Sequence, residues 1–193
     1  MARPSILRAL CTAVAALAVS ASVAHAASTL ERIRDRHSIV FAYRDGAAPF
    51  SFRDRDGHVR GYSVELCSRV AAAIRERLRL SDFAVEWVPV DAATRLDAVA
   101  AGRVDAECGT TTITLSRMER VDFSVPIFVD GGALAVALRS PVRRVADLGG
   151  RRVAVIPGTT TERALRAALD LTGVKATIVS VARPEEGAAM VRR

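Results

Sequence analysis

Residues 107–124 read ECGTTTITLSRMERVDFS, and the fold and function of the chain depend on how this stretch is interpreted. A short apolar segment runs into three consecutive threonines at residues 110–112, and Arg117 follows them. Hydroxyls, free backbone N–H groups and one guanidinium can together bind a small carboxylate, because the planar fork of arginine donors matches its two oxygens. A threonine-rich turn with a solvated arginine has the same local pattern, so the rest of the chain must decide between the two interpretations.

The N-terminal segment has the pattern of a secretory signal peptide. Arg3 and Arg8 precede an apolar run over residues 9–19, and the small residues Ala24 and Ala26 fit a cleavage site. This order of charge, apolar run and small residues is typical of exported proteins, and the run is short for a membrane span. We therefore predict that residues 1–26 are a cleaved signal peptide and that the mature chain is exported.

The composition argues against a nucleic-acid partner. The chain has 193 residues and a formal net charge of +7, which is enough length for one ordinary domain or two small lobes. Its arginines stand singly along the sequence, and Lys175 is the only lysine. Proteins that bind nucleic acids cluster their basic residues, so we expect no nucleic-acid partner. The sequence also indicates no metal site, no cofactor and no catalytic residue.

The cysteines allow two interpretations. Loss of the signal peptide removes Cys11 and leaves Cys67 and Cys108 in a compartment that permits disulfides. These two can form a bridge, and two buried free thiols fit the sequence equally well. A catalytic Cys108 is disfavoured because His37 and His58 lie far from it in sequence and nothing else suggests a base.

The first half of the mature chain alternates between strand and helix patterns. A capping box at residues 28–31 opens a short helix, and Phe50 and Phe52 alternate with polar residues as in a half-buried strand. Strands are expected at residues 39–43, 83–88 and 104–107, and helices at residues 63–80 and 92–101. This order predicts an α/β fold with a largely parallel sheet covered by helices. Ligands bind beyond the carboxyl ends of such strands, where the loops from Arg44 and Thr110 begin.

A second strand–helix unit follows near residue 140. An apolar run predicts a strand at residues 133–138, and further strands are expected at 153–156 and 178–181. Thr159 and Glu162 form a capping box for a helix that ends at Gly173. Another helix opens at residues 184–186, and we expect this second unit to be incomplete.

Several short motifs follow one another in an order shared with a known family. They are APFSF at residues 48–52, DG at 56–57 with GYSVEL at 61–66, GRVD at 102–105, TIT at 112–114 with Arg117, VDFS at 121–124 and GTT at 158–160. The chain resembles the extracytoplasmic solute-binding proteins that serve polar-amino-acid ABC transporters. The resemblance implies the two-lobed type II periplasmic binding protein fold. It places a first ligand-binding lobe at residues 27–131 and a hinge strand with a partial second lobe at 132–193.

Two segments are similar to the glutamate/aspartate-binding branch, namely ECGTTT at residues 107–112 and IFVDG at 127–131. That similarity implies arginines for a second carboxylate at Arg44 and Arg95. It implies that the ligand α-carboxylate is held by Thr110, Thr112, Arg117, Thr159 and Thr160. A dicarboxylate needs two cationic partners, because an unpaired buried charge is costly.

Other interpretations of these side chains remain open. Arg44 can be a solvated loop residue, and Arg95 can lie on the exposed face of its helix. Of the two neighbouring aromatic residues, Phe52 is the candidate for the ligand site and Phe50 is interpreted as core. The segment PEE at 184–186 stands where the dicarboxylate branch often places a histidine.

The implied function is that of a periplasmic solute-binding component of an amino-acid ABC importer. The resemblance implies a monomer whose lobes close over an acidic amino acid about a hinge at residues 131–138, and an ABC permease in the inner membrane as its partner. Two alternatives remain: a periplasmic enzyme on the same scaffold, similar to cyclohexadienyl dehydratase, or a ligand-sensing module of a larger receptor. An enzyme needs a general acid or base, and the nearby Glu107 and Asp122 are interpreted as structural.

Overall fold

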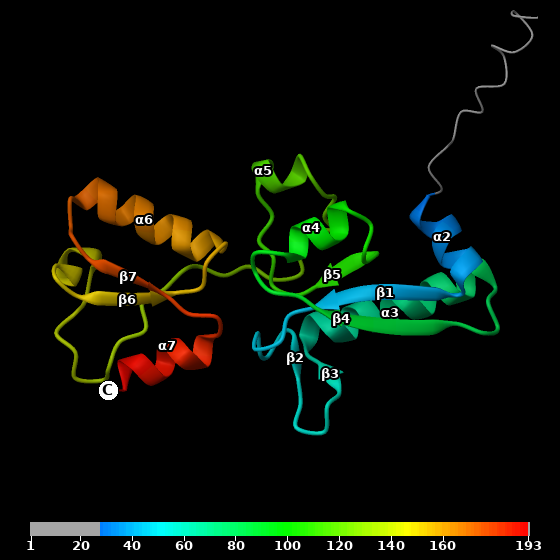
Figure 1. Cartoon of the computed structure of the whole chain (residues 1–193), viewed down its shortest axis with the longest axis horizontal. Coiled ribbons are helices and arrows are strands. Elements are labelled where there is room, and N and C mark those ends of the chain that lie inside the picture. The colour runs from blue at the N-terminus through cyan, green and yellow to red at the C-terminus, as the bar shows by residue number, and fades with distance from the viewer. Residues whose placement is uncertain (1–27, 193) are drawn as a thin grey trace, which may run out of the picture. The chain divides into compact units, whose positions relative to one another are not determined.

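The computed structural model describes residues 28–192, so the predicted signal peptide lies outside the described residues (Figure 1). The described residues belong to two units, which meet between Arg32 and Ile33 in the sequence. Helix α2 spans Thr29–Arg36, and its predicted capping box is present: the Ser28 N–H donates to Glu31 and the Glu31 N–H donates to the Ser28 hydroxyl. Among the described residues, no helix combines the length and the apolar character that crossing a membrane requires.

A parallel three-stranded sheet forms the centre of the first part of the 33–193 unit. Its strand order is β4–β1–β5, with β1 at Ser38–Tyr43, β4 at Ala84–Pro89 and β5 at Ala106–Cys108. The central strand is buried on both faces, which explains its continuous apolar sequence. The predicted β-α-β-α-β order and parallel pairing are therefore confirmed.

Helices cover both faces of this sheet. Helix α3, Tyr62–Leu78, contributes Ala71 to a core with Phe41, whereas helix α4, Arg95–Ala100, contributes Ala98 to a separate core with Ala42. Successive side chains of a strand point to opposite faces, so the two helices lie on opposite sides. Cys67 on α3 and Cys108 on β5 are joined by a disulfide. Of the two interpretations of these cysteines, the structure therefore has the bridge and not the free thiols.

Helix α4 starts later than the sequence predicts. Its expected start was residue 92, but the observed helix begins at Arg95. The Asp91 carboxylate accepts the backbone N–H groups of Ala93 and Thr94, and this local bonding stabilises a turn in place of the first helical turn. The hydrogen bond from the Thr94 hydroxyl, followed by these backbone bonds, lowers the pKa of Asp91.

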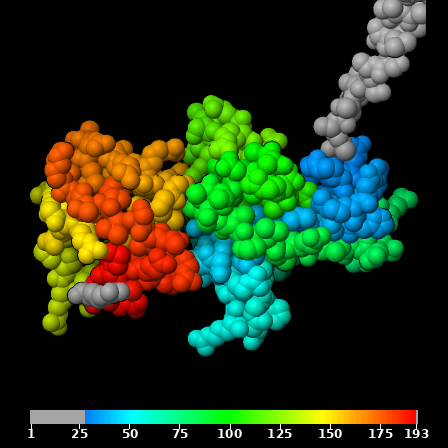
Figure 2. Space-filling model, in the orientation of Figure 1, coloured from blue at the N-terminus to red at the C-terminus, as the bar shows by residue number. Residues whose placement is uncertain are grey.

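A short hairpin follows β1. Strands β2, Phe52–Arg53, and β3, Val59–Arg60, pair antiparallel, and the hairpin stands out from the surrounding atoms in Figure 2 (cyan). The loop before it contains a cis peptide bond between Ala48 and Pro49. Further along the chain, the one-turn helix α5, Leu115–Met118, follows the threonine segment.

The last part of the chain has its own small sheet. Strands β6, Arg152–Val155, and β7, Thr177–Ser180, pair in parallel. Figure 1 shows α6, Thr160–Thr172, and α7, Pro184–Val191, on opposite sides of this strand pair. The 3-10 helix η1, Val145–Leu148, completes this part. Its core consists of Val142, Leu148, Val155, Leu165 and Leu169.

The predicted strand at residues 133–138 is wrong. The structure gives this apolar run no strand, and Leu138 is 99% exposed. A strand requires hydrogen bonds to a neighbouring strand, and among the described residues nothing pairs with this segment. The predicted division of the chain at residue 131 stays a prediction.

Candidate functional site

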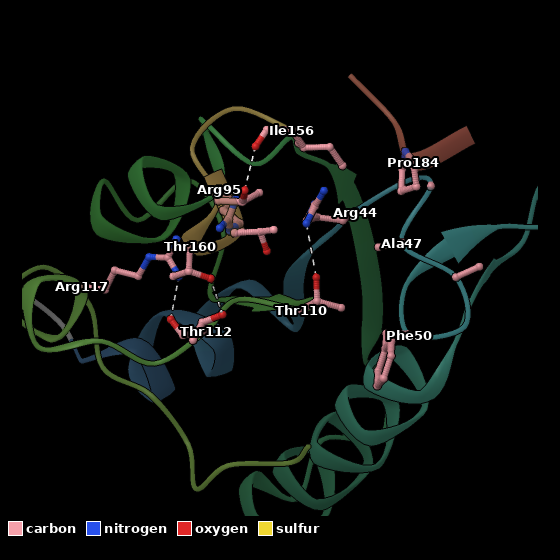
Figure 3. Close-up of a pocket in the computed structure, with 14 residues that line it drawn as sticks. Arg44, Ala47, Phe50, Arg95, Thr110, Thr112, Arg117, Ile156, Thr160 and Pro184 are labelled. Carbon is pink, nitrogen blue, oxygen red and sulfur yellow. Dashed lines mark hydrogen bonds between the residues drawn. The ribbon is translucent and has the colours of Figure 1, made fainter. Parts of the chain in front are cut away.

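A cavity of about 270 Å³ lies within the 33–193 unit, and its walls are built at the carboxyl ends of strands (Figure 3). The residues that line it are Arg44, Gly46, Ala47, Ala48, Phe50, Arg95, Thr110, Thr112, Arg117, Ile156, Thr159, Thr160, Thr161 and Pro184. Arg44 follows β1, Thr110 follows β5, Thr159 follows β6 and Pro184 follows β7. The cavity lies where the sequence predicts a site, beyond the strand ends of both sheets, and its role as the ligand site stays a prediction.

Arg44 is buried at the start of its loop. It is 8% exposed, and its backbone N–H donates to the Ser51 hydroxyl at 2.9 Å. Its Nη1 donates to Thr110 Oγ1 at 3.3 Å, while its buried Nε has no hydrogen-bond partner among the described residues. The solvated alternative is thus wrong for Arg44. Its guanidinium points into the cavity beside Thr110 in Figure 3.

Arg95 is also held in place by the protein. It is only 2% exposed, which excludes the exposed-face alternative for its position on α4. Its Nε donates to the Thr111 hydroxyl, and its Nη1 donates to the Ala92 carbonyl at the start of the same turn. Two anchors on one planar guanidinium fix its orientation. Thr111 was not predicted as a site residue, although it stands between two that were.

Arg117 connects the threonine segment to the start of α6. Its Nη1 donates to the Thr112 carbonyl at 2.7 Å, and its Nη2 donates to the Gly158 carbonyl at 3.3 Å. The Thr112 and Thr160 hydroxyls lie 3.1 Å apart and form a further hydrogen bond beside it (Figure 3). Residues that are far apart in sequence are therefore joined at one side of the cavity.

The N-terminus of α6 presents its first turn to the cavity. Thr159 is the N-cap, and its hydroxyl accepts the Glu162 N–H at 3.1 Å as the capping box predicts. The Glu162 carboxylate accepts instead from the Gly158 N–H, one residue earlier than expected. Gly158 has a φ of 73°, and a Cβ there would lie 3.1 Å from the Ala92 carbonyl oxygen, so glycine allows this loop to approach the turn before α4 closely.

The charge at the site is strongly positive. Among the described residues that line the cavity, Arg44, Arg95 and Arg117 carry charge and no aspartate or glutamate is present. Burial lowers the pKa of Arg95 to about 10 and also lowers the pKa of Arg117, and both guanidiniums remain protonated at neutral pH. Burial raises the pKa of the nearby Glu107 carboxyl, against the attraction of these arginines. The arrangement favours an anionic ligand.

Phe52 is not among the cavity-lining residues, and Phe50 is. Phe52 lies in β2, paired with Arg60, whereas Phe50 belongs to the turn before that strand. Phe50 contacts Tyr62 and Phe128 edge-on, with ring centroids 6.0 and 4.8 Å apart. The cavity therefore gives no support to Phe52 as a ligand residue, and that role stays a prediction.

Other lining residues were not predicted at all. They are Gly46, Ala47, Ala48, Ile156, Thr161 and Pro184. Most are small or apolar and carry no chemical signal, but each lies within a few residues of a predicted strand end, which is the pattern that could have indicated them.

The hairpin turn offers the oxygen and nitrogen atoms of a metal site at Asp54, Asp56 and His58. Both oxygens of Asp54 are already engaged, one by the backbone N–H groups of Asp56 and His58 and the other by the Arg60 guanidinium. The Arg60 hydrogen bond is also the main cause that lowers the pKa of Asp54. These hydrogen bonds explain why the three side chains lie together in the hairpin turn. The expectation from the sequence that the protein has no metal site stays a prediction.

Comparison with known proteins identifies the family. Residues 39–183 match the bacterial extracellular solute-binding proteins, family 3. The chain belongs to this family. The L-glutamate/L-aspartate-binding protein of Pseudomonas aeruginosa is 37% identical over 85% of this chain and 54% of that protein. The glutamate/aspartate import solute-binding protein of Salmonella typhimurium is 34% identical over 81% of this chain and 54% of its own length.

Solved structures agree with the two-lobed α/β fold. An ancestral amino acid-binding protein, described as a precursor of cyclohexadienyl dehydratase, superimposes with a TM-score of 0.74 at 29% identity, covering 86% of this chain and 70% of that one. An ancestral arginine-binding protein bound to arginine gives 0.70 at 25% identity, covering 81% of this chain and 66% of that one. This chain spans about half the length of the curated relatives that it matches.

Proposed function

We propose that this family 3 protein is the solute-binding component of an amino-acid ABC importer and that it binds an acidic amino acid. The observation that carries the proposal is the cavity in which Arg44, Arg95 and Arg117 converge without a carboxylate among the described lining residues. A dicarboxylate buried there gains a cationic partner for each of its carboxylates. The names of the relatives from Pseudomonas and Salmonella support the same ligand class.

Each group at the site has a role in this proposal. Arg117 holds the α-carboxylate together with the hydroxyls of Thr110 and Thr112. Thr159 and Thr160 add hydroxyls and the N–H groups of the first turn of α6, where the helix dipole favours an anion. Arg44 and Arg95 hold the side-chain carboxylate. The contacts of Thr112 and Arg117 with the start of α6 support this division of labour, because they join the two halves of the anion site.

The wider setting is part of the proposal. The protein is exported to the periplasm by a cleaved signal peptide, is a monomer and delivers its ligand to a permease in the inner membrane. Closure takes place about residues 131–138, and the lack of regular structure in this segment is compatible with a hinge.

Calorimetric titration of the purified protein with glutamate, aspartate, glutamine, arginine and histidine tests the function. Glutamate or aspartate should bind most tightly. Absence of heat with every ligand would contradict the transport role, and a preference for glutamine or arginine would contradict the acidic-ligand assignment.

We further propose that the protein is not an enzyme, because the two relatives described above are named as binding proteins and no carboxylate is among the described residues that line the cavity. The dehydratase alternative has one specific support, the name of the ancestral structure, which is itself an amino acid-binding protein. Incubation with prephenate and arogenate distinguishes the two, and measurable turnover would overturn the binding-protein proposal.

A further inference from the structure

The threonine segment leaves the sheet before it reaches the cavity. Strand β5 ends at Cys108, which pairs with Tyr43, and the structure gives residues 109–114 neither strand nor helix. Thr110 and Thr112 line the cavity, so they lie beyond the backbone hydrogen bonds of the sheet. Contacts from other elements therefore hold this stretch of backbone in place.

Ser63, near the start of α3, contacts this stretch directly. The residue is 2% exposed, and its hydroxyl donates to the Gly109 carbonyl at 2.8 Å. Cys67 lies one turn later on the same face of α3 and is bonded to Cys108. The helix is thus attached to two consecutive residues of the chain, and Thr110 comes immediately after them.

Ser63 also holds the loop that follows β1. Its backbone N–H donates to the carbonyl of Phe50, a residue that lines the cavity, at 3.0 Å. The adjacent Ser51 is fully buried, and its hydroxyl accepts the backbone N–H of Arg44. A Cβ on Gly61, the N-cap of α3, would lie 2.2 Å from the Phe50 carbonyl oxygen, so this close approach of the helix requires glycine.

The loop and the threonine segment meet at the cavity. Arg44 Nη1 donates to Thr110 Oγ1 at 3.3 Å, and Figure 3 shows the two side chains directed toward each other. This distance is slightly long for such a bond, so a small shift of either piece of backbone would break it. Ser63 bonds to both pieces and is not among the described residues that line the cavity.

We propose that Ser63 is a positioning residue for ligand binding, whose hydroxyl holds the threonine segment so that Thr110 reaches the ligand α-carboxylate beside Arg44. This inference rests on the proposed function, in which Thr110 and Arg117 hold that carboxylate. Every amino acid has an α-carboxylate. Loss of the Ser63 hydroxyl should therefore weaken binding and leave the preference among amino acids unchanged.

The test measures the Kd of L-glutamate and of L-glutamine by calorimetry in the wild-type, Ser63→Ala and Ser68→Ala proteins. Ser63→Ala should weaken the binding of both ligands about tenfold, the effect of one misplaced hydrogen bond to a charged group. Ser68→Ala is the matched control, because the Ser68 hydroxyl donates to the Val64 carbonyl within the same helix, and it should bind like wild type. A loss for glutamate alone would overturn the assignment to the α-carboxylate.

Two measurements separate positioning from a general structural effect. A tenfold loss through unfolding requires about nine molecules in ten to be unfolded without ligand, and urea denaturation should show Ser63→Ala to be folded. In a Thr110→Val background, Ser63→Ala should cause no further loss of affinity, because its effect passes through the Thr110 hydroxyl. Wild-type affinity in folded Ser63→Ala, or additive losses in the double variant, would overturn the positioning role.

Ser63→Thr and Ser63→Val form a second matched pair, which decides the question if Ser63→Ala does not fold. Their side chains have nearly the same shape and differ in the hydroxyl, so glutamate should bind more tightly to Ser63→Thr, and equal affinities would overturn the inference. A wild-type protein that binds none of the titrated amino acids would overturn the proposed function as well. Normal wild-type binding with an unaffected Ser63→Ala would overturn this inference alone.

Discussion

Arg117 is the residue whose loss should affect ligand binding most clearly. Its guanidinium is oriented by the carbonyls of Thr112 and Gly158, and it faces the cavity with donors that suit a carboxylate. Arg117→Ala should weaken glutamate binding about tenfold to a hundredfold, because each charge-assisted hydrogen bond contributes about 1.5–3 kcal/mol. Isothermal titration measures the change.

Arg69→Ala is the matched control for Arg117→Ala. Arg69 is exposed on α3 and pairs with Glu65, so its removal deletes one arginine away from the cavity. Similar losses in the two variants would show that net charge, and not the Arg117 contacts, governs binding.

Glu107 should also give the protein a measurable dependence of stability on pH. Burial raises the pKa of Glu107 in the folded protein above the ordinary 4.5. Between pH 4.5 and this raised pKa, the folded state retains a proton that the unfolded state loses. The free energy of unfolding of the wild-type protein therefore contains a contribution that is present at low pH and is lost as pH rises through this interval. Glu107→Gln lacks this titration, so its stability relative to wild type should increase with pH.

Urea denaturation of both proteins across a pH series measures this difference. Glu86→Gln, at an exposed position on β4, is the matched control and should follow the wild-type curve. A constant difference between Glu107→Gln and wild type at every pH would contradict a raised pKa for Glu107.

At the scale of elements, the first turn of α6 depends on its cap. The Thr159 hydroxyl accepts the Glu162 N–H and donates to the Ile156 carbonyl at 2.8 Å. Thr159→Ala should lower the free energy of unfolding by about 1 kcal/mol, and Thr159→Ser should retain most of it because it keeps the hydroxyl. Chemical denaturation compares the three proteins, and equal losses for alanine and serine would mean that the methyl packing, and not the cap, matters.

Elements with local signals could be predicted from the sequence, and those that depend on partners could not. The capping residues Ser28 and Thr159 marked the starts of α2 and α6 because a cap is decided within one turn of helix. The apolar run at 133–138 fulfils every local condition for a strand, but a strand also needs a neighbour. Phe50 lies in the turn before β2, where it lines the cavity and also packs against Phe128, and this arrangement depends on a residue distant in sequence.

The candidate site was predictable to the extent that topology determines it. Parallel strands bring their carboxyl ends to one edge, so the convergence of Arg44 with Thr110 follows from the strand order. The burial of Arg95 was not predictable, because it depends on Thr111 and the Ala92 carbonyl, which the sequence does not relate to it.

At the scale of the whole molecule, the disulfide between Cys67 and Cys108 links α3 to the strand that leads into the site. The bridge spans a sequence separation of 41 residues, and loss of such a constraint costs about 2–4 kcal/mol of stability. Cys67→Ser/Cys108→Ser should therefore denature at a lower urea concentration than the oxidised wild type. Dithiothreitol should reduce the stability of the wild type and leave the double variant unchanged. Equal stability of all forms would contradict a stabilising bridge.

The affinity ratio between glutamate and glutamine tests the central claim most directly. The two ligands have nearly the same shape and differ at the group that Arg44 and Arg95 are proposed to hold. Calorimetric titration of the purified wild-type protein should show glutamate binding at least about tenfold more tightly than glutamine, the effect of one charge-assisted contact. Equal affinities, or tighter binding of glutamine, would contradict the assignment of this cavity to an acidic amino acid.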